Sequence, residues 1–205
     1  YCNDDSIKEY AFYLKNNSRE TIIENFKEQY LEKTSDSHLF INNNNMIFIW
    51  KKFLKEKKLP LILFSNELQE NLNLPYDKND DIYYEITSRK LNKVKLFNSF
   101  WNKYIVINEK EQDFKIGEIV RIYNHKNSNN KLTEDYVISI IEHFHNKLIT
   151  DNKYIHGISC ILWNKEKEID KAITAYDKNK DITILNLYKH YCNYSKNIGF
   201  PYIVS

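Results

Sequence analysis

The chain has 205 residues, a formal net charge of +2 and 42% hydrophobic residues, which provides enough apolar surface for a core and excludes wholesale disorder. Its only glycines, Gly117, Gly157 and Gly199, lie far apart, which excludes the phosphate loops GxxxxGK and GxGxxG and the nucleophile turn GxSxG. The three cysteines form no disulfide framework, and there is no signal peptide or apolar run of membrane-spanning length. We therefore expect an intracellular protein of a reducing compartment, without a membrane partner.

The first part of the chain predicts helices, because apolar residues recur there every three or four positions. The pattern runs over Asp4–Lys15 and then over a second helix that Ser18 caps. A third helix covers Met46–Lys58 and ends before Pro60, and a short fourth helix covers Ser65–Leu72.

The middle of the chain mixes both kinds of element. An acidic turn at Pro75–Asp81 precedes Ile82–Thr87, whose alternation fits a short strand nearly as well as a loop. A helix follows over Leu91–Tyr104, and Ile105–Ile107 is either a strand or the last turn of that helix.

The order of elements from 113 to 163 is typical of a winged helix-turn-helix. A helix over Asp113–His125 precedes the polar linker Asn124–Lys131, and Thr133 caps the next helix. The β-branched stretch Ile149–Trp163 predicts a β-hairpin, although its spacing also fits a helix. In the first turn of the supposed recognition helix, Glu134 and Asp135 would repel phosphate, and this counts against entry into a DNA groove.

The fold class expected from these elements is mostly α with a small β-ribbon (α+β). We expect a helical N-terminal region at 1–75 and a second region at 76–205. The second region holds the winged-helix-like module and two C-terminal helices, Lys165–Tyr176 and one that Asp181 caps. A single continuous domain is the alternative.

Two basic clusters are candidate nucleic-acid contacts. The stretch 87–103 carries five cations and no acid, with Phe97, Phe100 and Trp101 between them. Such rings can stack on bases, but their helical spacing favours a buried stripe. The second cluster lies on and beside the polar linker. The candidate nucleic-acid-binding residues are Arg89, Lys90, Lys93, Lys95, Lys103, Arg121, Lys126 and Lys131.

Other groups of polar residues give weaker signals. The lysines of 51–58 are typical of the solvated face of an amphipathic helix. The acidic residues of 77–85 either bind a basic partner or keep a turn soluble. His143 and His145 face different sides of a helix, and His156 with Cys160 supplies only two ligands. We therefore expect no metal, no cofactor and no catalytic residue.

A resemblance to one family of proteins rests on the order and type of residues in the C-terminal half. The runs that carry it are Phe97-x-x-Phe100-Trp101, Ile116-x-Glu118-Ile119, Ile141-x-His143-Phe144, Lys153-Tyr154-Ile155, Cys160-x-Leu162-Trp163-Asn164-Lys165 and Tyr188-x-x-Tyr191-Cys192. This stretch, from Phe97 to Ser205, resembles the region after the helicase core of poxvirus-type and giant-virus primase–helicases, which ends in a winged-helix DNA-binding module. The ATPase motifs of that family are absent, so its activity is not carried over.

The resemblance implies a DNA-contacting or assembly module within a larger viral replication protein, with DNA favoured over RNA, in the host cytoplasm or a viral factory. The start at Tyr1 and the apolar run at the C-terminus also lead us to expect a piece of a longer polypeptide, whose other parts are among its partners. We expect a non-catalytic nucleic-acid-binding module of a viral replication or transcription protein. The alternative is a protein-interaction or assembly module that contacts no nucleic acid.

Overall fold

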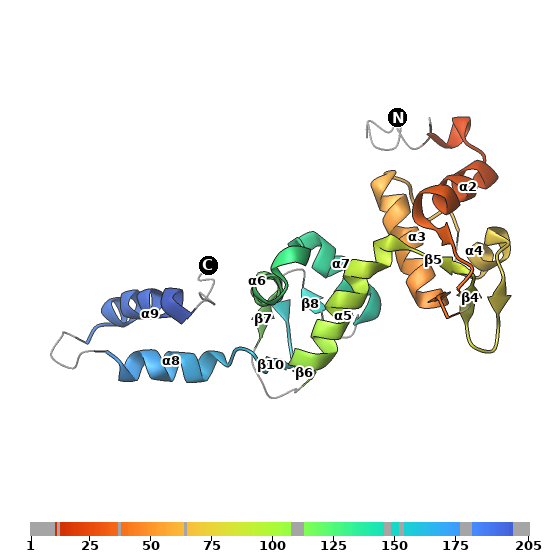
Figure 1. The fold of residues 1–205 in the computed structure, drawn as a ribbon. Coiled ribbons are helices and arrows are strands. Elements are labelled where there is room, and N and C mark those ends of the chain that lie inside the picture. Colours follow the sequence, from red (N-terminus) through yellow and green to blue (C-terminus); the bar gives the residue numbers. More distant parts are fainter. Residues whose placement is uncertain are drawn as a thin grey trace. The chain divides into compact units, whose positions relative to one another are not determined.

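The computed structural model describes residues 11, 13–36, 38–63, 65–107, 113–145, 149–151, 154–176 and 182–198. The chain divides into two compact units, Tyr1–Asn92 and Lys93–Ser205, and the described residues are mostly helical with small antiparallel sheets (Figure 1). The boundary expected after residue 75 falls within the first unit. Strands that follow residue 75 pair there with strands that precede it, which joins the two stretches into one body.

The first unit combines helices with very short strands. Its helices are α2 (Arg19–Tyr30), α3 (Asn43–Glu56), α4 (Ser65–Leu72) and the 3₁₀ helix η1 (Arg89–Leu91), and its strands are β1 (Glu32–Lys33), β2 (Phe40–Asn42), β3 (Tyr76–Asp77), β4 (Ile82–Tyr84) and β5 (Ile86–Thr87). One antiparallel sheet has the order β2-β4-β3, and β1 pairs with β5. The predicted strand Ile82–Thr87 is therefore present but interrupted, because Glu85 adopts a left-handed conformation with φ of 57°.

Side-chain caps begin the two long helices of the first unit. The Ser18 hydroxyl accepts the Thr21 N–H at 3.3 Å, as the sequence predicted. The Asn42 side chain accepts the Asn45 N–H at 2.8 Å, which starts α3 before the predicted Met46. Most of the predicted helix Asp4–Lys15 lies outside the described residues.

Aromatic rings fill the core between α2 and α3. Phe26 of α2 is fully buried, and its ring meets Trp50 and Phe53 of α3 edge-on, with centroids 5.1 and 5.5 Å apart. Figure 1 shows the two helices side by side. The apolar stripes that predicted both helices are therefore the faces on which the two helices pack.

In the sequence of the second unit, helices come before, between and after the strands. Its helices are α5 (Asn92–Tyr104), α6 (Ile116–Lys126), the 3₁₀ helix η2 (Ser128–Asn130), α7 (Glu134–Phe144), α8 (Lys165–Thr174) and α9 (Ile184–Ile198), and its strands are β6 (Ile105–Ile107), β7 (Phe114–Lys115), β8 (Ile149–Asp151), β9 (Tyr154–Ile155) and β10 (Ile158–Cys160). One antiparallel sheet has the order β7-β9-β8, and β10 pairs with β6.

Two sequence-based expectations are refined by this pairing. Only the first half of the predicted hairpin Ile149–Trp163 is a hairpin, because β10 leaves it to pair with Ile105–Ile107. The predicted helix Asp113–His125 starts later, at Ile116, because β7 occupies the two preceding residues and pairs with β9.

The connection between α6 and α7 is more ordered than its polar sequence predicted. Asn124 clamps the backbone of Leu132: its Oδ1 accepts the Leu132 N–H at 2.8 Å, and its Nδ2 donates to the Leu132 carbonyl at 2.9 Å. The Thr133 hydroxyl then accepts the Tyr136 N–H at 3.4 Å and caps α7, as predicted. These bonds satisfy backbone groups that a mobile linker would leave to water.

The core of the second unit forms around the rings of α5 and α6. The Tyr123 ring lies 5.5 Å from Phe97 and 5.3 Å from Phe100, measured between centroids. Phe97, Phe100 and Trp101 are 0, 4 and 3% exposed. The buried-stripe interpretation of these rings is therefore confirmed, and the idea that they stack on bases is wrong.

A buried ion pair ties the start of α8 to α6. Lys165 Nζ lies 2.5 Å from Glu118 Oε2 and donates to the Asp113 carbonyl at 2.8 Å, and both side chains are almost fully buried. Glu118 also accepts the Lys115 N–H at 2.9 Å. The Lys165 ammonium lies 4.1 Å from the Phe114 ring centroid, so rings and oxygens surround the charge.

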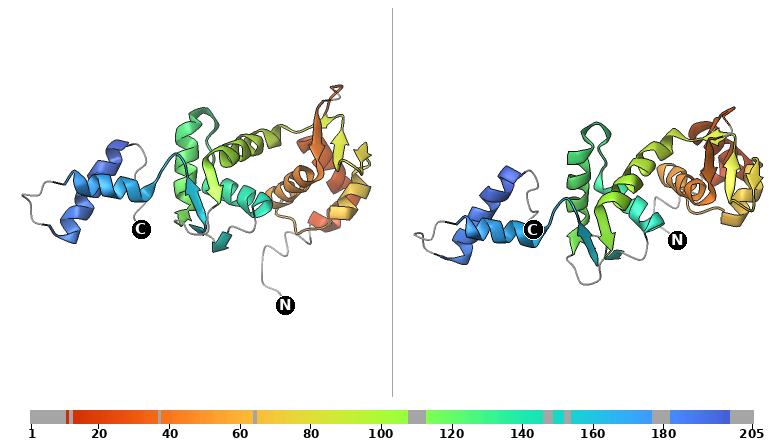
Figure 2. Two further views of the ribbon diagram at one scale, coloured as in Figure 1. Left: turned by 90° about the horizontal axis from the view of Figure 1, so that it is seen from below. Right: turned by 60° about the horizontal axis from the view of Figure 1, so that its bottom comes forward.

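The helices α8 and α9 pack against each other in every view (Figure 2). The Tyr191 hydroxyl of α9 donates to Glu168 of α8 at 3.0 Å, and His190 contacts the Ala172 carbonyl. The predicted cap Asp181 lies outside the described residues, and the Thr183 hydroxyl accepts the Asn186 N–H at 3.2 Å.

Candidate nucleic-acid interface

The first two candidate cations, Arg89 and Lys90, belong to η1 of the first unit and have local partners. Arg89 Nε lies 2.9 Å from Glu32 Oε1, and the Lys90 ammonium lies 4.8 Å from the Tyr30 ring centroid. The Arg89 side chain is 83% exposed, so water screens this ion pair. Both residues therefore have local partners within the first unit, beside any contact with phosphate.

The outer surface of α5 carries Lys93, Lys95 and Lys103, all of them exposed. The helix contains no carboxylate. Lys93 and Lys95 are two residues apart, so they project from different sides of the exposed arc. The three charges consequently spread over that arc instead of forming one row.

The outer surface of α6 and of the turn after it is also basic. Arg121 and Lys126 are exposed on α6, and Lys131 is exposed just after η2. The only carboxylate of α6 is Glu118, which is 2% exposed and contacts Lys165. The exposed faces of α5 and α6 thus present cations without an accompanying acid.

Tyr104 brings the two predicted clusters together. The Lys103 ammonium lies 5.2 Å from the centroid of the half-buried Tyr104 ring, and the Lys126 ammonium lies 5.9 Å from the same centroid. One lysine comes from the end of α5 and the other from the end of α6. Two ammonium groups beside one ring form a local centre of positive charge with an aromatic face.

Sequence reasoning placed Tyr104 only at the end of a predicted helix and did not identify its contacts with two lysines. The adjacent Lys103 was a visible signal. The second lysine, Lys126, lies 22 positions after Tyr104, and only the packing of α5 with α6 shows that it reaches the same ring.

The exposed surface of α7 has the opposite charge. Glu134, Asp135 and Glu142 are all exposed. The first two stabilise the positive end of the helix, whereas Glu142 lies in the last turn, where a carboxylate is unfavourable. This face would be repelled by the phosphates that line a DNA groove.

The acidic turn of the first unit forms the connection between β3 and β4, and its carboxylates bond within it. Asp77 Oδ1 accepts the Asn79 N–H at 2.7 Å, and its other oxygen is 3.5 Å from the Tyr84 hydroxyl. The Tyr76 hydroxyl donates to Asp81, and this bond raises the pKa of Tyr76 to about 12. These contacts give Asp77 and Asp81 a structural role in the turn.

Histidine and cysteine side chains do not converge within the described part of the chain. His156 contacts the Asp113 carboxylate, and burial raises the pKa of the Cys160 thiol. The His145 ring stacks on Trp101 at 4.7 Å between centroids, and burial lowers its pKa. In the described ranges no three His, Cys, Asp or Glu side chains are placed to hold a metal ion.

No helix in the described ranges combines the length and the apolarity needed to cross a membrane.

Comparison with protein-family models, curated proteins and solved structures found no match for this chain. The resemblance to the post-helicase region of viral primase–helicases therefore stays a prediction.

Proposed function

We propose that the second unit is a non-catalytic nucleic-acid-binding module whose contact surface is formed by α5 and α6. The observation that carries the proposal is the convergence of Lys103 and Lys126 on Tyr104, between two helices whose exposed faces have no carboxylate. Ammonium groups bind phosphates, and an aromatic face accepts a base or a sugar.

The order of strands supports interpreting this module as a winged helix. The helix α5 precedes β7, the helices α6 and α7 lie between β7 and β8, and β9 takes the middle place in the sheet β7-β9-β8. In this interpretation β8 and β9 form the wing, and α7 occupies the position of the recognition helix.

The charge of α7 implies contact with the backbone and not with base edges. Glu134 and Asp135 would meet phosphates first if α7 entered a groove. Lysine ammonium groups bind phosphates without reading base edges, so we expect the contact through Lys103 and Lys126 to depend little on base sequence. If the primase–helicase resemblance holds, the ligand is DNA and the parent a viral replication protein.

The test is fluorescence anisotropy with labelled single- and double-stranded DNA over a range of salt concentrations. The double substitution Lys103→Ala/Lys126→Ala should weaken binding and lower the slope of log K against log salt by about 0.9 per lost phosphate contact on duplex DNA. The matched control, Lys51→Ala/Lys55→Ala on the exposed face of α3, removes the same charge from the first unit and should leave the slope unchanged. Equal effects of both pairs, or binding that ignores salt, would refute the proposal.

A second candidate function is protein interaction, favoured by exposed apolar side chains on the β6–β10 pair. Ile107 is 64% exposed and Ile161, just after β10, is 67% exposed. Isolated exposed side chains are common on monomers, so this candidate requires a contiguous patch. It predicts that Ile107→Ser/Ile161→Ser, which adds no charge, abolishes binding of an apolar dye, and that the unmodified chain shows no salt-sensitive binding to DNA.

A further inference from the structure

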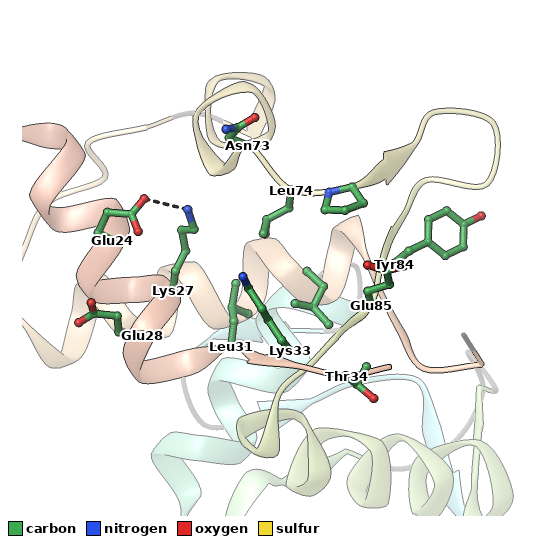
Figure 3. Close-up of a pocket in the computed structure, with 12 residues that line it drawn as sticks. Glu24, Lys27, Glu28, Leu31, Lys33, Thr34, Asn73, Leu74, Tyr84 and Glu85 are labelled. Carbon is green, nitrogen blue, oxygen red and sulfur yellow. Dashed lines mark hydrogen bonds and ion pairs between the residues drawn. The ribbon is translucent and has the colours of Figure 1, made fainter. Parts of the chain in front are cut away.

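A cavity of about 560 Å³ opens on the first unit. It lies among α2, β1, the loop after α4 and the junction of β4 with β5 (Figure 3). Its apolar lining includes Leu31, Leu74 and Ile86. The volume falls within the range of small-molecule and peptide-anchor sites in proteins.

Two of the residues that line the cavity have a left-handed backbone conformation. Asn73 has φ of 47° and Glu85 has φ of 57°. At the second residue the strand bends: the Tyr84 N–H donates to the Pro75 carbonyl at 3.0 Å, whereas the Thr34 N–H donates to the Glu85 carbonyl at 2.9 Å. The loop after α4 and β1 therefore diverge and leave the space between them.

The residue at the bend is not the one that backbone geometry favours. Glycine adopts a left-handed conformation without a steric penalty, and a glutamate does not. Asp81 is another acidic residue in a left-handed conformation, and its side chain accepts the Tyr76 hydroxyl, whereas no side-chain hydrogen bond is described for Glu85. Glu85 instead adds an exposed charge to the rim of the cavity.

The charges around the cavity are unequal. Glu24 and Lys27 pair with each other at 2.8 Å, which removes one carboxylate and one ammonium. In Figure 3, Glu28 lies on the side of α2 and Glu85 on the opposite side, with Lys33 between them. Within the described part of the chain, no ion pair joins these three residues to another side chain. Two carboxylates and one ammonium thus surround an apolar floor.

We infer that this cavity binds a short segment of a partner protein in which a lysine or arginine adjoins an apolar side chain. The cation would lie beside Glu85, and the apolar side chain would cover Leu31 and Leu74. Lys33 would donate to a backbone carbonyl of the segment. A simple polyamine has no carbonyl and could not accept this hydrogen bond. The site belongs to the first unit, so it is independent of the DNA surface proposed for the second.

The inference is tested by NMR titration of the isotope-labelled chain with acetylated, amidated tripeptides. Leu-Arg-Leu should cause saturable shifts at backbone amides around the cavity, and Leu-Gln-Leu and Leu-Glu-Leu should bind more weakly by about tenfold or more, the equivalent of one lost charged contact. Glu28→Gln should weaken binding of Leu-Arg-Leu to a smaller extent, because Lys33 lies between Glu28 and Glu85. Glu70→Gln on α4, which removes an exposed carboxylate away from the cavity, should not.

The substitution Glu85→Gly separates a binding role from a purely structural one. Removing the side chain relieves the left-handed backbone, so the midpoint of urea unfolding should hold or rise while binding of Leu-Arg-Leu weakens by about tenfold or more. Unchanged affinity in this variant would overturn the inference, because the glutamate would then matter only to the turn. Absence of saturable shifts in the unmodified chain, or equal binding of all three tripeptides, would also overturn it.

Discussion

Replacing Lys165 with methionine should be among the most destabilising single changes in the second unit. The side chains of Lys165 and Glu118 are 7% and 2% exposed, and the two charged atoms are 2.5 Å apart. Methionine keeps the packing against Phe114, but it leaves the Glu118 carboxylate with only the Lys115 N–H as a described donor. An unpaired buried charge of this kind costs about 3–5 kcal/mol.

That cost is a large share of the total stability of a domain, which is about 5–15 kcal/mol. Lys165→Met should therefore lower the urea midpoint strongly, measured by circular dichroism and by tryptophan fluorescence. The double variant Glu118→Leu/Lys165→Met should lose less stability than Lys165→Met alone, because neither charge remains unpaired in it. Its residual loss comes from the Lys115 N–H and the Asp113 carbonyl, which lose their partners.

Two results would refute this reasoning. One is a loss below about 1 kcal/mol in Lys165→Met, which is the range of an exposed pair. The other is additivity of the two single changes in the double variant, which would mean that the side chains do not interact.

Three further outcomes are expected. Thr133→Ala removes the cap of α7 and should cost about 1 kcal/mol in urea unfolding, whereas Ser128→Ala in η2 should cost little. Burial lowers the pKa of His145 in the folded chain, so the unfolded chain binds this proton at a higher pH than the folded chain does. The free energy of unfolding should therefore fall as the pH drops below about 6.5. His145→Gln should flatten this pH dependence. The bond to Asp81 raises the pKa of Tyr76 to about 12 from its ordinary 10.0, so the stability that this bond contributes should be lost as the pH rises from 10.0 to about 12. Tyr76→Phe should remove one late step from an ultraviolet titration of the tyrosines.

The described helices were largely predictable from the sequence, because most of them carry an apolar stripe and two begin at a recognisable cap. Ser18 and Thr133 cap the helices for which they were predicted. The α3 cap was missed because Asn42 lies in an asparagine run, where no single position stands out.

Strand pairing was less predictable, because it depends on contacts between distant residues. Cys160 pairs with Ile105, and no local pattern indicates that β10 prefers β6 to the neighbouring β9. The kink at Glu85 was also invisible, because sequence signals for a left-handed residue centre on glycine and asparagine.

The candidate site was predicted only in part. The sequence identified Lys103 and Lys126 as cations but assigned them to separate clusters, and their meeting at Tyr104 needed the packing of α5 with α6. Arg89 was predicted as a phosphate contact, and its pairing with Glu32 joins residues 57 positions apart.

Taken by themselves, the exposed cations of α5 and α6 and the exposed carboxylates of α7 form a local dipole moment in the second unit. A polyanion approaching in solution would exert a torque on this moment and turn the basic side forward before any contact forms. Orientation would then act on the encounter rate, which should decline with ionic strength more steeply than the lifetime of the bound state. Substituting lysine for Glu134 and Asp135 would add positive charge to α7. It would nevertheless reduce the orientation of the unit toward a polyanion, because α7 would no longer differ in charge from α5 and α6.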